Sequence, residues 1–395
     1  MNSQKTRRAL VVCLGIPPCL PRPRRMVNYL VKEGISVDCL CYNHLIDNSL
    51  CIEEYFFLKL RKGLFGISLC HRLIRHLPSL ILSFSNKLFS CANFVNDWHL
   101  NVFKHELRIR KKSYDWIVVE DLKLLPLAFR VKGTSKILFD AREYYTRQFE
   151  DHPLWKILEL PYRNYLCQNY LNKCDHILTV SEGLKSEYNR EYKINPIVVR
   201  STPVSESVKV KKTALPIRLV HHGNANENRN LSKMVDVFSK LKDHFTFDFY
   251  LTGNQTEIQK LKCLTAKYPR IQILNPVLPE LLIQTLNKYD IGFYYLLPNG
   301  FNLKHCLPNK FFDFIQARLP VAIGPSPEMK DLIRKYDCGF VAKEFSVESM
   351  AHTLNKLNIS DIDIAKENSD RASKKLCWEE EAQKLKAIFK LNSKF

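Results

Sequence analysis

A lysine and a carboxylate one helical turn apart give the clearest chemical signal in the sequence. Pro308 and Asn309, which precede Lys310 and Asp313, are residues that commonly begin helices. A lysine in the first turn of a helix is electrostatically unfavourable unless an anion is near it, and Asp313 shares its face. The pair suits a nucleoside diphosphate, with the amine on a phosphate and the carboxylate on the ribose hydroxyls. A surface salt bridge fits the same spacing.

A polar turn containing one glycine gives the second signal. Residues 222–230 (HGNANENRN) separate a predicted strand at 217–221 from a helix that begins at 231. Gly223, next to Asn224, lets the backbone approach a ligand closely, and the start of a helix offers free N–H groups. Arg229 adds a planar, bidentate positive charge. The turn therefore suits a phosphate group, and an asparagine-capped polar turn is the alternative interpretation.

Arginines gather near the amino terminus as well. Arg22, Arg24 and Arg25 lie at the junction between a predicted strand at 9–14 and a predicted helix at 24–33. Such a cluster at a strand-to-helix junction suits a phosphorylated ligand. A basic surface loop explains the same residues.

These candidate residues are separated by alternating short apolar runs and longer helical patterns. Strands are predicted at 9–14, 36–41, 114–119, 136–139, 176–180, 217–221, 245–251, 271–274, 291–295 and 320–323. The alternation favours parallel sheets covered by helices on both faces. A polar stretch at 200–216 interrupts it. We therefore expect an α/β chain of two tandem Rossmann-like domains, with ligands at the carboxyl ends of the strands in a cleft between the domains.

Composition excludes several classes of protein. The 395 residues are 46% hydrophobic and 11% aromatic, too apolar for a disordered, collagen-like or mucin-like chain. Thirteen cysteines without a C-x-x-C pair indicate reduced thiols. The amino-terminal apolar run is too short for a signal peptide, and no run of about 20 apolar residues predicts a membrane span. The net charge of +20 predicts anionic partners.

One segment, residues 56–112, departs from the α/β pattern. Its acids are Asp97 and Glu106, and Phe and Leu lie between its basic residues, which are Lys59, Arg61, Lys62, Arg72, Arg75, Lys87, Lys104, Arg108, Arg110, Lys111 and Lys112. Interleaved basic and apolar residues favour a surface that lies on an anionic membrane. Amphipathic helices with a solvated basic face are the alternative.

Residues 307–323 (LPNKFFDFIQARLPVAI) resemble the donor-site segment of GT-B glycosyltransferases, in particular the retaining family 4 enzymes of bacterial surface-polysaccharide synthesis. The Gly223-to-Arg229 turn resembles the phosphate loop of that family. Further resemblances follow in the family's order at residues 114–128 (YDWIVVEDLKLLPLA), 137–146 (ILFDAREYYT), 180–184 (VSEGL) and 378–380 (WEE).

The resemblance implies roles for individual residues. It implies donor binding by Gly223, Asn224, Arg229, Lys310 and Asp313, catalytic roles for Arg142, Glu143 and His305, and acceptor binding by Gly15, Arg22 and Arg24. Two motifs depart from the family: His305 and Asp313 stand where two glutamates are usual, and Arg142 replaces a histidine. Arginine cannot act as a base. Glu143 also fits a simpler role, as a carboxylate at a helix start.

The resemblance also implies a domain plan: an acceptor-binding domain at 1–203, a linker at 204–216, a donor-binding domain at 217–375, and a helix at 376–395 that returns to the first domain. The implied activity is transfer of a sugar, with retention, from a nucleotide-sugar to a growing lipid-linked glycan of capsule or O-antigen type. No metal or other cofactor is expected, and the expected location is the cytoplasmic face of the plasma membrane.

Three other functions stay open at this stage. Nucleotide-sugar 2-epimerases share the fold and are soluble, so the basic aromatic segment argues against them. A nucleic-acid-binding protein fits the positive charge, but the sequence has none of the usual motifs, and no nucleic acid is expected as a partner. An inactive transferase-like subunit fits the departures at residues 142, 305 and 313.

Overall fold

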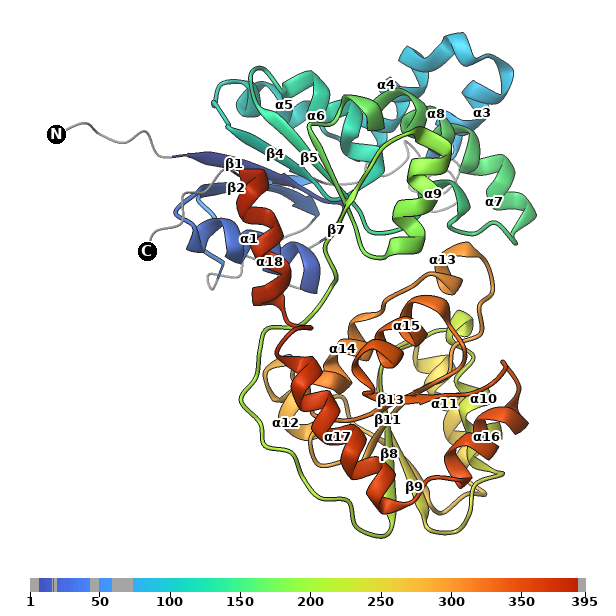
Figure 1. The fold of residues 1–395 in the computed structure, drawn as a ribbon. Coiled ribbons are helices and arrows are strands. Elements are labelled where there is room, and N and C mark those ends of the chain that lie inside the picture. The colour runs from blue at the N-terminus through green and yellow to red at the C-terminus, as the bar shows by residue number, and fades with distance from the viewer. Residues whose placement is uncertain (1–6, 16, 18–19, 43–49, 59–73, 390–395) are drawn as a thin grey trace, which may run out of the picture. The chain divides into compact units, whose positions relative to one another are not determined.

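The chain divides into two compact units, coloured from blue to red along the sequence in Figure 1. The computed structural model describes residues 7–15, 17, 20–42, 50–58 and 74–389. The first unit comprises residues 1–199 with 300–302 and 386–395. The second comprises residues 200–299 and 303–385.

The first unit is built on a sheet of seven parallel strands in the order β3-β2-β1-β4-β5-β6-β7. The strands β1 and β4 are almost entirely buried because helices cover both faces of the sheet. The bounds are β1 (Arg8–Val12), β2 (Ser36–Tyr42), β3 (Glu54–Leu58), β4 (Trp116–Val119), β5 (Lys136–Ala141), β6 (His176–Thr179) and β7 (Ile197–Val198).

Most helices of the first unit lie between its strands along the chain. The unit also includes the end of the last helix of the chain. They are α1 (Pro21–Lys32), α3 (Leu77–Phe84), η2 (Asn86–Leu88), α4 (Phe89–Leu100), α5 (Phe103–Arg110), η3 (Leu122–Leu124), α6 (Leu125–Val131), η4 (Tyr145–Arg147), α7 (Pro153–Leu158), α8 (Leu160–Tyr170), η5 (Leu171–Lys173) and α9 (Glu182–Tyr192). The end of α18 (Trp378–Phe389) belongs to this unit, since the rings of Phe389 and Trp116 lie 4.9 Å apart. This contact confirms the predicted return of the last helix.

The second unit contains six parallel strands in the order β10-β9-β8-β11-β12-β13. They are β8 (Ile217–Ala225), β9 (Phe245–Gly253), β10 (Ile271–Leu274), β11 (Ile291–Tyr294), β12 (Val321–Ile323) and β13 (Gly339–Val341). The helices are η6 (Glu227–Arg229), α10 (Leu231–Phe238), α11 (Gln255–Thr265), η7 (Pro279–Leu281), α12 (Leu282–Leu286), α14 (Asn309–Gln316), α15 (Pro327–Tyr336), α16 (Val347–Asn355) and α17 (Ile359–Ser373). The short helix α13 (Phe301–Lys304) is divided between the units after residue 302.

The position of α14 depends on a glycine in β11. The helix buries Phe311, Phe314 and Ile315 against the sheet. A Cβ atom at Gly292 would lie 2.3 Å from the ring of Phe314, so α14 packs this closely on β11 only because residue 292 has no side chain. This packing fixes the place of Lys310 and Asp313 on the same helix.

The stretch at 200–216 groups with the second unit, so the chain divides between residues 199 and 200 rather than at 203. The backbone N–H of Arg200 donates to Glu381 (2.8 Å) and that of Thr213 donates to Asp363 (2.8 Å). These bonds tie the two ends of the stretch to α17 and to the first part of α18, residues 378–385, which belongs to the second unit.

Each strand predicted from the sequence is present, and both sheets are parallel as expected. The strands β3, β7 and β13 were not predicted. The interpretation of residues 56 and 57 as membrane-facing is wrong for Phe56, which lies in β3 and is fully buried. Lys59, Arg61, Lys62 and Arg72 lie outside the described residues. In the part of the chain that is described, no helix is long and apolar enough to cross a bilayer.

Candidate functional site

Two of the predicted donor residues meet where β8 ends. Gly223 has a φ of +122°, a conformation that favours glycine. A Cβ atom at this position would lie 2.9 Å from the Nζ atom of Lys310, which is 87 residues away in the chain. The backbone conformation therefore favours glycine at residue 223, and a side chain there would also displace the end of Lys310.

Lys310 is buried in this site without a carboxylate in ion-pair contact among the described residues. Its Nζ atom lies 3.5 Å from Nε2 of His221 and 5.0 Å from the ring centre of Tyr294. Burial and the nearby Arg229 lower the pKa of Lys310 to about 7, while Asp313 opposes the shift. The site therefore holds an ammonium group that lacks a close counterion.

Arg229 brings a second positive charge to the same place. It ends η6, directly after β8, and its Nη1 atom donates to the hydroxyl of Tyr294 (3.0 Å). Tyr294 is the last residue of β11, and Lys310 lies over its ring. Two cations beside a glycine turn, at the carboxyl ends of neighbouring strands, form a site that attracts an anion.

Asp313 lies one turn after Lys310 and is partly exposed. One of its carboxylate oxygens lies 3.5 Å from Nε2 of His222. Burial and the charge of Lys310 lower the pKa of His222 to about 3, so this imidazole is neutral at pH 7. A neutral ring carries no charge to form an ion pair with this carboxylate. Asn224 is exposed, and its side chain lies against Gly253 at the end of β9.

His305 follows α13, and its Nδ1 atom lies 3.0 Å from a carboxylate oxygen of Glu328 in the first turn of α15. This contact holds the imidazole in one orientation. The next residue, Cys306, is close enough to Lys310 to influence its pKa. Glu328 was not singled out from the sequence, because its partner His305 is 23 residues away.

In the first unit, Arg22 is engaged with a carboxylate. Its guanidinium forms two bonds to Asp140 (2.5 and 2.8 Å) and one to the backbone oxygen of Val199 (2.7 Å), and the whole side chain is buried. Arg24, two residues on in α1, is half-buried. Gly15 lies in the turn after β1, and its backbone oxygen accepts a bond from the N–H of Tyr42 (3.1 Å).

Arg142 and Glu143 follow the end of β5. Arg142 donates to the backbone oxygen of Glu120 (3.0 Å) and to the carboxylate of Asp121 (3.2 Å). Burial raises the pKa of Glu143, and the charge of Arg142 opposes this shift. Arg142 thus joins the carboxyl ends of β4 and β5.

Glu120 is a residue that the sequence reasoning did not single out. It comes directly after β4, is completely buried, and neither carboxylate oxygen has a hydrogen-bond partner among the described residues. Burial first, and the neighbouring Asp140 second, raise the pKa of Glu120 to about 8. The sequence feature that could have identified Glu120 is an acidic residue immediately after an apolar strand.

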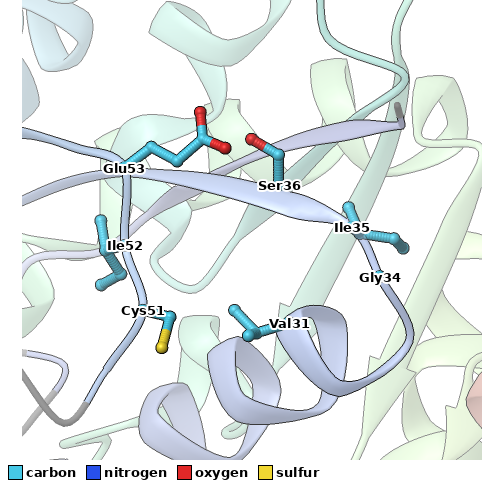
Figure 2. A pocket seen from close by; sticks show the side chains of 7 residues that line it. All are labelled: Val31, Gly34, Ile35, Ser36, Cys51, Ile52 and Glu53. Atoms are coloured by element: carbon cyan, nitrogen blue, oxygen red, sulfur yellow. The ribbon is translucent and has the colours of Figure 1, made fainter. Parts of the chain in front are cut away.

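The pocket drawn in Figure 2 lies elsewhere in the first unit. It has a volume of about 460 Å³ and is lined by Val31, Gly34, Ile35, Ser36, Cys51, Ile52 and Glu53. Ser36 is the first residue of β2, so this wide depression lies at the amino end of that strand. None of the predicted site residues lines it. Among the described residues, no three His, Cys, Asp or Glu side chains are grouped so as to hold a metal ion.

Comparison with known proteins gives matches to solved structures alone. No protein-family model matches the chain, and no curated protein sequence matches it. Sucrose-phosphate synthase from Thermosynechococcus elongatus superposes with a TM-score of 0.69 at 11% identity, over 97% of this chain and 98% of that one. HepE from Anabaena in complex with UDP-glucose gives 0.67 at 11% identity, over 97% and 99%. The fold is GT-B.

A third GT-B structure, the lipopolysaccharide outer core galactosyltransferase WaaB, gives a TM-score of 0.63 at 12% identity, over 97% of this chain and 99% of that one. The GT-B assignment confirms the predicted fold class. At such low identities the likeness concerns the fold, and the roles of individual residues depend on the geometry described above.

Proposed function

We propose that the chain is a glycosyltransferase that moves a sugar from a nucleotide-sugar to a growing lipid-linked glycan in envelope polysaccharide synthesis, of capsule or O-antigen type. The supporting observation is the anion site at the ends of β8 and β11, where Gly223, Lys310 and Arg229 meet. GT-B structures with similar folds include one bound to UDP-glucose and one named as a lipopolysaccharide galactosyltransferase.

The donor diphosphate would lie over Gly223, between the Nζ atom of Lys310 and the guanidinium of Arg229. Negative charge accumulates on the diphosphate as the bond to the sugar breaks, and the buried Lys310 and the half-buried Arg229 stabilise that charge most in the transition state. Asp313 would accept hydrogen bonds from the ribose hydroxyls. Asn224, which is exposed on β8 next to Gly223, would contact the donor from the side of β9.

The reaction that we propose proceeds with retention of configuration. The acceptor oxygen forms its bond to the anomeric carbon on the face that the diphosphate leaves, and the acceptor proton passes to the departing phosphate oxygen. This route needs no protein base, which agrees with arginine at position 142. Arg142, Glu143 and His305 would contact the donor sugar, and Glu328 would orient His305.

On the acceptor side, we assign Gly15 and Arg24 to contact with the acceptor. Arg22 would orient Asp140, to which it is hydrogen-bonded. A lipid-linked acceptor places the enzyme at the inner face of the plasma membrane as a peripheral protein. The net charge of +20 supports contact with an anionic surface there.

The test is a transfer assay with labelled nucleotide-sugars and lipid-linked glycan acceptors from envelope preparations, run on the wild type and on Lys310→Ala. We expect one donor to be consumed only when an acceptor is present, with retained configuration in the product, and the variant to lose the activity. Activity that persists after chelation of divalent ions is expected, because Lys310 and Arg229 supply the positive charge. Donor conversion without acceptor would indicate an epimerase instead, and donor binding without turnover would indicate an inactive subunit.

A further inference from the structure

Large apolar side chains are exposed at one corner of the first unit, where α3, η2 and α4 follow one another. Phe84, at the end of α3, is 87% exposed. Leu88 and Phe89, at the junction of η2 and α4, are 42% and 46% exposed. Exposed apolar residues that occur singly need no explanation, but a group of this size marks a contact surface.

The short helix α7 extends this surface. It contacts α3, and the two helices lie at the same end of the first unit in Figure 1. None of the six residues of α7 is buried, although its sequence (PLWKIL) is mainly apolar. Leu154 is 60% exposed and Ile157 is 57% exposed. Trp155 is half-buried and its ring lies 6.2 Å from that of Phe149, so the apolar side chains of α7 that face solvent are Leu154 and Ile157.

The exposed charged side chains on these helices are all positive. The four elements α3, η2, α4 and α7 contain one acid, Asp97, which is buried and paired with Arg130 (2.6 Å). Lys87 and Lys156 are exposed beside the apolar side chains. Asp151, an exposed acid, precedes α7, but the four elements themselves present exposed lysines beside their apolar side chains and so match an anionic lipid surface in polarity and charge.

Three of the basic residues in and after α5 are paired with carboxylates. Arg108 pairs with Glu54, Arg110 with Glu106, and Lys112 with Asp38. These residues belong to the segment 56–112 that the sequence marked as a membrane surface, yet their charges are largely neutralised within the fold. Within that segment we therefore consider the corner around η2, and α7, which lies outside the segment, adjoins this corner through α3.

We propose that Phe84, Leu88, Phe89, Leu154 and Ile157, flanked by Lys87 and Lys156, form a docking surface that inserts into the headgroup region of an anionic bilayer. This inference deepens the proposed function, because it names the membrane-binding surface of a transferase with a lipid-linked acceptor. Burial of the five side chains in the bilayer supplies the affinity, and the two lysines make it depend on anionic lipid.

The test is co-sedimentation with vesicles of phosphatidylethanolamine and phosphatidylglycerol, compared with vesicles of phosphatidylcholine. The test variant is Phe84→Ser combined with Leu88→Ser, and the control is Ile364→Ser, which changes a side chain on α17 that is also 57% exposed. We expect the wild type and the control to bind the anionic vesicles, and the double variant to bind about tenfold more weakly. Unchanged thermal midpoints would show that both variants fold.

Equal binding of the double variant and the wild type would overturn the proposal, as would equal binding of the wild type to neutral and anionic vesicles. Failure of the wild type to bind vesicles, together with a dimer that the double variant converts to a monomer, would assign the surface to a second copy of the chain. The assay contains no nucleotide. A failure of the proposed transferase activity is therefore distinguishable from a failure of membrane docking.

Discussion

At the scale of single residues, the arrangement around Gly223 indicates why a lysine is buried in the second unit although its charge is destabilising there. Lys310 is held between the imidazole of His221 and the ring of Tyr294, and Arg229 repels it. A buried cation that is repelled by a neighbour is costly in the empty protein. A bound diphosphate removes that cost, and the energy recovered contributes to the binding of the donor.

A substitution at Asp313 distinguishes binding of the ribose from binding of the diphosphate. Asp313→Asn keeps the size of the side chain but weakens the hydrogen bonds to the ribose hydroxyls. We expect nucleoside diphosphate to bind about tenfold more weakly. Inorganic pyrophosphate has no ribose and should bind the variant and the wild type alike. Titration calorimetry measures both, and an equal loss for the two ligands would contradict the assignment.

The pH dependence of donor binding follows from the pKa of Lys310, which burial and Arg229 lower to about 7 in the empty site. A bound anion favours the ammonium form, so the pKa rises in the complex. Below pH 7 the lysine is already protonated and its contribution to the affinity is constant. Above pH 7 each unit of pH costs up to about tenfold in affinity, because binding must then take up a proton.

Lys310→Arg is the control for that pH profile, because an arginine stays charged throughout. The affinity of this variant for nucleoside diphosphate should not change between pH 7 and pH 9. A flat profile for the wild type would contradict the account, as would an equal slope for the two proteins.

At the scale of elements, the site depends on how closely α14 packs on β11. In Gly292→Ala the added methyl group meets the ring of Phe314, 2.3 Å away, and displaces the helix. We expect a loss of about 1–3 kcal/mol in the free energy of unfolding and weaker nucleotide binding. Chemical denaturation and titration measure the two effects.

Gly15→Ala is the comparison for Gly292→Ala. Its added methyl group meets only the flexible end of the Leu20 side chain, so the loss of stability should be smaller. A larger loss in Gly15→Ala than in Gly292→Ala would show that the packing of α14 is not the sensitive contact.

The sequence predicted these elements well where a strand is a continuous apolar run. It missed β7, which has two residues, and β3, whose adjacent phenylalanines resembled a membrane surface. It predicted Gly223, Lys310 and Asp313 as one group from a local turn and from positions in one helix, and the structure brings Gly223 and Lys310 together. It missed Glu120, His221 and Glu328, whose surroundings are formed by residues distant in the chain.

At the scale of the whole molecule, the last helix ties the end of the chain to the first unit. The ring of Phe389 is buried against Trp116 and Tyr29, and Arg7 donates to its backbone oxygen (3.2 Å). Phe389→Ala removes this packing and should lower the free energy of unfolding of the first unit by about 3 kcal/mol. Phe84→Ala, at a position that is 87% exposed, is the control and should leave stability unchanged. Equal effects of the two substitutions would contradict this role for α18.

The most direct test of the central claim is titration calorimetry of UDP, GDP, ADP and CMP against the wild type, Lys310→Ala and Lys310→Arg at pH 7. The account predicts that one base is preferred, that Lys310→Ala loses about 30-fold in affinity, and that Lys310→Arg keeps most of it. Absence of binding by all four nucleotides, or equal binding by the wild type and Lys310→Ala, would contradict the assignment of this site to a nucleotide-sugar donor.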